Sequence, residues 1–96
     1  MISREDFVFT IGFEKDAAIV DSKARSKYGH MDSMALAREG LFRAAFASTL
    51  YSKDDKEFRA FAEYYNSVAA SNYSKPEDFM RLFGVKEENI KKVLAL

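Results

Sequence analysis

Cationic side chains gather in one short segment of this sequence, and they are the first candidates for chemistry. Lys23, Arg25 and Lys27 alternate along residues 21–30. In an extended chain, alternate residues share one side, so the segment could contact an anion or a nucleic acid. Three charges are a weak nucleic-acid footprint, however. The interpretation we favour is therefore a solvated connection that contains one helical turn.

Catalytic and metal-binding patterns are missing from the sequence. His30 is the sole histidine and there is no cysteine, so a metal site would have to be built almost wholly from carboxylates. No ligand spacing suggests such a site. The sequence shows no Gly-rich phosphate loop and no Ser/His/Asp arrangement. We therefore expect no enzyme, no cofactor and no metal.

Arg38 is one of two cations inside the longest apolar run of the chain. The run at residues 33–51 predicts a helix, with Asp32 or Ser33 as its N-cap. At helical spacing Arg38 falls at the border of the large apolar side chains. Its stem would be buried there, and its head must reach water or a carboxylate. Arg38 is thus a candidate contact for a small anionic ligand.

The same predicted helix has one arc of large and one arc of small side chains. Gly40, Ala44 and Ala47 belong to the small arc. Side chains of this size let another backbone approach closely. The partner could be another part of this chain, which we favour, or the same helix of a second copy. Gly40 and Ala44 are the candidate residues of such a dimer seam.

Two interpretations of the amino-terminal segment stay open. Residues 7–13 alternate between apolar and small or polar side chains, a pattern typical of a strand. With residues 17–20 they predict a β-hairpin over about residues 7–21, closed by a three- or four-residue loop. The alternative is a helix that begins at Ser3, because the spacing from Ser3 to Asp6 resembles a capping box. We favour the hairpin.

Three further helices are predicted, over about residues 54–70, 75–83 and 87–95. The first has apolar residues at i, i+3, i+4 and i+7, and Tyr64 points away from that stripe toward solvent or a partner. We expect one domain, residues 1–96, of α+β class. Its N-terminal hairpin packs against a body of about four helices.

The last two predicted helices resemble the spacing of a helix-turn-helix DNA reader. A helix is followed by Gly84 and Val85, and then by the aliphatic residues Ile90 and Val93. Met80 departs from the pattern, because such motifs place a small residue where the helices cross. The resemblance implies a DNA-binding protein that uses this pair of helices and the basic segment at residues 23–27.

Composition favours a different function. The 96 residues carry 15 basic and 15 acidic side chains, so no net charge draws the chain to nucleic acid or to an anionic membrane. No apolar run is long enough to span a membrane, and we expect a cytoplasmic protein without membrane contact. Our leading hypothesis is a protein–protein interaction module that forms a homodimer. DNA binding is the alternative, and a small anionic-ligand binder or enzyme is the third.

Overall fold

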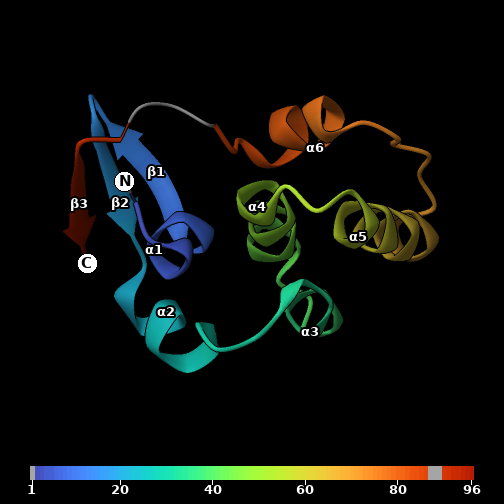
Figure 1. The fold of residues 1–96 in the computed structure, drawn as a ribbon, viewed down its shortest axis with the longest axis horizontal. Helices are drawn as coiled ribbons and strands as arrows, with labels where there is room; N and C mark the ends of the chain where they lie inside the picture. The colour runs from blue at the N-terminus through green and yellow to red at the C-terminus, as the bar shows by residue number, and fades with distance from the viewer. Residues whose placement is uncertain (1, 87–89) are drawn as a thin grey trace. The chain divides into compact units, whose positions relative to one another are not determined.

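The computed structural model describes residues 2–86 and 90–96, which form two compact units. Unit 1 contains residues 2–30 and 90–96, and unit 2 contains residues 31–86. The elements of unit 1 are α1 (Arg4–Val8), β1 (Thr10–Glu14), β2 (Ala17–Val20), α2 (Ser22–Tyr28) and β3 (Lys92–Ala95). Those of unit 2 are α3 (Ser33–Arg38), α4 (Phe42–Ser52), α5 (Asp55–Ala69) and α6 (Pro76–Phe83). The predicted α+β class, with its N-terminal hairpin, is confirmed (Figure 1).

A three-stranded sheet in the order β1-β2-β3 forms the centre of unit 1 (Figure 1). β1 and β2 are an antiparallel hairpin, and β3 pairs with β2 in parallel. Glu14 pairs with Ala17, so the turn consists of Lys15 and Asp16 alone and is shorter than predicted. Lys15 takes a left-handed conformation, with φ of 56°, to close it. β2 therefore has hydrogen-bonded neighbours on both edges.

The predicted strand at residues 7–13 is wrong over its first part. α1 occupies Arg4–Val8, and the Oγ of Ser3 accepts the N–H of Asp6 at 3.2 Å, as the helix alternative expected. The register also shifts between Thr10 and Gly12, which places an extra residue in β1. A bulge of this kind breaks the alternation of side chains. Ile11 is consequently 55% exposed instead of facing the core.

The predicted helix at residues 33–51 is two helices, α3 and α4, separated at Gly40. Gly40 has φ of 80°, which an α-helix cannot accommodate. The N–H of Leu41 bonds to the carbonyl of Leu36 at 3.0 Å, and the N–H of Gly40 to that of Ala37 at 2.9 Å. These two bonds are the Schellman ending of a helix. Gly40 therefore terminates α3, and it does not lie on a helical face.

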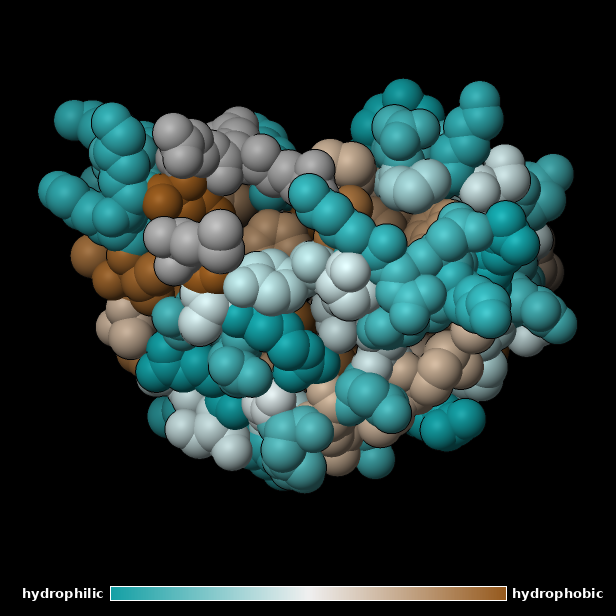
Figure 2. All heavy atoms as spheres, viewed as in Figure 1, coloured by the Kyte–Doolittle hydropathy of each residue, from teal (hydrophilic) through white to brown (hydrophobic). Residues whose placement is uncertain are grey.

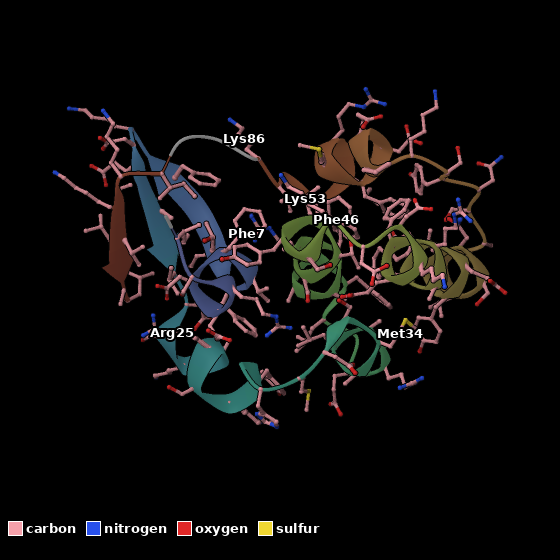
Figure 3. The ribbon with its side chains drawn as sticks, viewed as in Figure 1. Phe7, Arg25, Met34, Phe46, Lys53 and Lys86 are labelled. Atoms are coloured by element: carbon pink, nitrogen blue, oxygen red, sulfur yellow. The ribbon has the colours of Figure 1, made fainter. Side chains whose placement is uncertain are left out.

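Aromatic rings fill the core of unit 2. Phe46 of α4, Phe61 of α5 and Phe79 of α6 are fully buried, and Figure 3 shows Phe46 on its helix. Phe79 lies at the centre of the cluster, with its ring centroid 5.3–6.2 Å from those of Phe46, Phe58, Phe61, Tyr65, Tyr73 and Phe83. Edge-on and offset ring pairs stabilise the core beyond the area that they bury.

Local backbone contacts define both ends of α6. Lys75 is its N-cap, and Pro76 begins the helix. The Asp78 carboxylate accepts the N–H groups of Lys75 at 3.2 Å and Ser74 at 3.4 Å. These two bonds hold the pKa of Asp78 below its ordinary value of 3.8, and the bond from Lys75 has the larger effect. The predicted end at Gly84 is confirmed, because that residue has φ of 68°.

The predicted helix at residues 87–95 is wrong in its described part. Residues 87–89 lie outside the described residues, Ile90 and Lys91 are irregular, and Lys92–Ala95 is the strand β3. The spacing of Ile90, Val93 and Leu94 fits a helix, but pairing with β2 stabilises the strand instead. The second helix of the helix-turn-helix pattern is therefore missing from the described residues, and the resemblance fails.

Removing the ring of Phe79 from the aromatic core should cause a large loss of stability. Phe79→Ala is expected to lower the free energy of unfolding by about 3–5 kcal/mol, since the cavity would lie among the surrounding rings. Leu82→Ala on the same helix is the matched control, because Leu82 is 42% exposed. Its cost should stay below about 1 kcal/mol. Urea denaturation measures both, and equal losses would contradict the central place of Phe79.

Substitutions at the ends of α3 and α5 should change the free energy of unfolding in opposite directions. Gly40→Ala should destabilise the fold by about 1 kcal/mol, because alanine is strained in the left-handed region. Ala70 already carries this strain, with φ of 53° at the end of α5. Ala70→Gly removes the strain but gives the unfolded chain more conformational freedom. The net effect should be a stabilisation of about 0.5 kcal/mol. Thermal unfolding measures both, and a loss of stability in Ala70→Gly would contradict the strain.

Candidate interaction surface

The outer edge of β3 is an unpaired strand edge. The N–H of Lys92 bonds to the carbonyl of Asp16 at 3.3 Å, and the N–H of Leu96 bonds to that of Val20 at 3.0 Å. Backbone groups of successive strand residues point to opposite edges. Those of Val93 and Ala95 therefore point away from β2. In the part of the chain that the structure describes, no further strand pairs with this edge.

Apolar side chains are exposed on the same sheet. All four residues of β3 are exposed. The exposed fractions are 39% for Val93, 44% for Leu94 and 73% for Leu96, and Ile11 of β1 is also exposed. Hydrophobic atoms gather over these strands, at the left of Figure 2. Because Val93 and Leu94 point to opposite faces, β3 is covered on neither face.

The two outer edges of the sheet differ in how far they are protected against pairing. β1 contains a bulge and Gly12, it ends at the charged residue Glu14, and Lys15 follows it. Bulges, charges and short regular segments are the features that prevent strands from pairing edge to edge. β3 is also short, at four residues, but it has no bulge, and its one charged residue is Lys92 at its start, followed by Val-Leu-Ala. The edge of β3 is thus the one open to a further strand.

The basic segment is a helix, and its cations are not on one side. α2 begins at Ser22 after the Asp21 cap, which confirms the helical-turn interpretation and rules out the extended one. Arg25, labelled in Figure 3, donates to the carboxylate of Asp6. Lys23 and Lys27 are exposed, and the Lys27 ammonium lies 5.2 Å from the ring centre of Tyr28. Arg25 therefore serves as a tie between α2 and α1.

The other predicted site residues lie apart from this edge. Arg38 is exposed in the last turn of α3, so the prediction of a buried stem is wrong. Ala44 is buried in α4 at 9% exposure. Tyr64 is half-buried with its ring 6.4 Å from that of Phe42, so it does not project freely from α5. With Gly40 at a helix end, Gly40 and Ala44 do not form a helical seam.

Polar side chains of unit 2 are engaged in joining its helices. Glu57 of α5 accepts the hydroxyl of Ser33 from α3 and that of Ser52 from α4, the latter at 3.3 Å. Arg43 of α4 donates its Nε–H to the carbonyl of Phe83 in α6 at 3.1 Å. Burial lowers the pKa of Arg43 below that of a fully hydrated arginine. The sequence carries no signal for these contacts, because each joins separate helices.

The described residues give little support for a ligand pocket, a metal site or a membrane-spanning helix. A shallow hollow on unit 2 is lined by Tyr73, Asp78, Arg81 and Leu82, but Arg81 already pairs with Asp78 at 3.0 Å. Among residues 2–86 and 90–96, no three His, Asp or Glu side chains are grouped to hold a metal ion. Within the same ranges, no helix has both the length and the apolar character needed to cross a membrane.

The residues of the β3 edge were missed because residues 87–95 were predicted as a helix. A run of Val-Leu-Ala is too short for periodicity to separate strand from helix. The available signal was the unpaired edge of the predicted hairpin, which is distant from Lys92 in the sequence. Comparison of the chain with protein-family models, curated proteins and solved structures finds no match.

Proposed function

We propose that this chain is a small protein–protein interaction module that associates with a second copy of itself. The observation that carries the proposal is β3, a strand exposed on both faces and along one edge. Strands that pair in parallel are normally covered on both faces. A second chain placed at β3 would cover apolar side chains that now face solvent. The backbone groups along its edge would also gain partners.

Charge and composition are compatible with self-association. The 15 basic and 15 acidic residues cancel, so two copies do not repel each other through their net charge. Binding is proposed as the activity, in place of catalysis, because the exposed features are apolar side chains and backbone groups. We also propose a cytoplasmic location, since the sequence has no cysteine that would require an oxidising compartment.

Self-association predicts a mass that depends on concentration. Light scattering on a size-exclusion peak should show a mass that rises from 11.0 kDa toward twice that value as the loading concentration increases into the high micromolar range. Because the contact is apolar and made by backbone groups, added salt should change the rise little. A constant mass of 11.0 kDa over the whole series would contradict the proposal.

A further inference from the structure

We propose that the β3 strands of two copies pair antiparallel about a two-fold axis that passes beside Leu94. This inference rests on the proposed function and names its interface. Pairing would join the two sheets of unit 1 into one continuous sheet. The proposed contact is made by the exposed edge of β3 in each copy.

Backbone geometry favours this register. Val93 and Ala95 direct their N–H and C=O groups to the open edge, as the bonds of Lys92 and Leu96 to β2 require. An antiparallel pair forms its hydrogen bonds between residues whose backbone groups face each other. With Leu94 on the axis, Val93 lies opposite the partner's Ala95, and Ala95 opposite the partner's Val93. Both outward-facing residues of each copy then bond to the partner.

In this register Leu94 lies on the two-fold axis, directly opposite the partner's Leu94. Leu94 and the partner's Leu94 form the pair without mutual hydrogen bonds, in which the Cα atoms lie about 4.5 Å apart. Side chains approach most closely in such pairs. The 44% of Leu94 that is exposed in one copy would thus be covered by the same residue of the other.

The charges of β3 are compatible with the register. Lys92 lies opposite the partner's Leu96, so no lysine faces a lysine. The two copies of Lys92 are offset by four residue steps along the strands, a distance of about 13 Å at about 3.3 Å per residue. Their repulsion is largely screened at physiological salt, where the Debye length is about 8 Å. The aliphatic stem of Lys92 can also cover the exposed side chain of the partner's Leu96.

The size of the contact sets its strength. One short strand from each copy covers less area than a standard protein–protein interface, and small interfaces are weak. We therefore expect rapid exchange between monomer and dimer, and a mass that responds to dilution. An extended peptide from another protein could use the same edge. The self-complementary register and the absence of opposed charges favour the second copy.

Two charge substitutions at Leu94 test the axis. Leu94→Lys places two like charges directly opposite each other, and so does Leu94→Glu. Each alone should raise the dimer dissociation constant by about tenfold or more, because leucine packing is lost and like charges oppose. An equimolar mixture of the two variants should recover a heterodimer, since lysine then faces glutamate. Sedimentation velocity on each variant and on the mixture measures the three states.

Proline substitution gives an independent test of the edge. Val93→Pro removes an N–H that points away from β2, so the β2–β3 pairing survives while the dimer is lost. Ala95→Pro should act in the same way. Circular dichroism of each variant, compared with the unsubstituted chain, checks that the monomer is folded. A Val93→Pro variant that is folded and as dimeric as the unsubstituted chain would overturn the proposal.

The outcomes separate this inference from the proposed function. A dimer that is weakened by both Leu94 substitutions and recovered by mixing supports the two-fold register. A dimer that is indifferent to Leu94→Lys and Leu94→Glu overturns the register and leaves the proposed function standing. Loss of the dimer in both variants without recovery on mixing places the axis elsewhere and also overturns it. An unsubstituted chain that stays monomeric at high micromolar concentration overturns both proposals.

Discussion

Strand β2 is paired on both edges, and the position of the open sheet edge in unit 1 follows from that arrangement. Its hairpin partner β1 forms locally, but its second partner is provided by residues 92–95, after the whole of unit 2. The loop-closure cost of bringing β3 back grows only slowly with the length between. Backbone bonds to Asp16 and Val20 hold β3 in place. The unpaired edge of the sheet is thereby moved from β2 to β3.

Unit 2 differs from unit 1 because it is stabilised by an aromatic core between helices and not by a sheet. Its helices meet around aromatic rings, with Phe79 at the centre. All four helices end at residues in the left-handed conformation: Gly40, Lys53, Ala70 and Gly84. Glu57 and Arg43 are used in hydrogen bonds between helices. Of the cations that suggested function in the sequence, Arg25 is bonded to Asp6, whereas Lys23, Lys27 and Arg38 are exposed. The unexplained surface is the apolar edge strand of unit 1.

Helices with a strong apolar stripe were predictable from the sequence, and elements that depend on distant partners were not. The range 54–70 agrees with α5, because the regular spacing of its apolar residues indicates a helix. The break at Gly40 had a local signal, a glycine followed by leucine at a Schellman position, which the long apolar run obscured. β3 had none, since its apolar spacing fits a helix and only β2, distant in sequence, stabilises the strand. The candidate site was missed for the same reason.

Amide hydrogen exchange at β3 tests the central claim most directly. The N–H groups of Val93 and Ala95 point to the open edge, while that of Leu96 bonds to Val20 within one chain and is an internal control. We predict that exchange at Val93 and Ala95 slows as protein concentration rises, because the second copy protects these groups. Exchange at Leu96 should be much less affected. Rapid exchange at Val93 and Ala95 that does not change with concentration would contradict the pairing of β3 with a second copy.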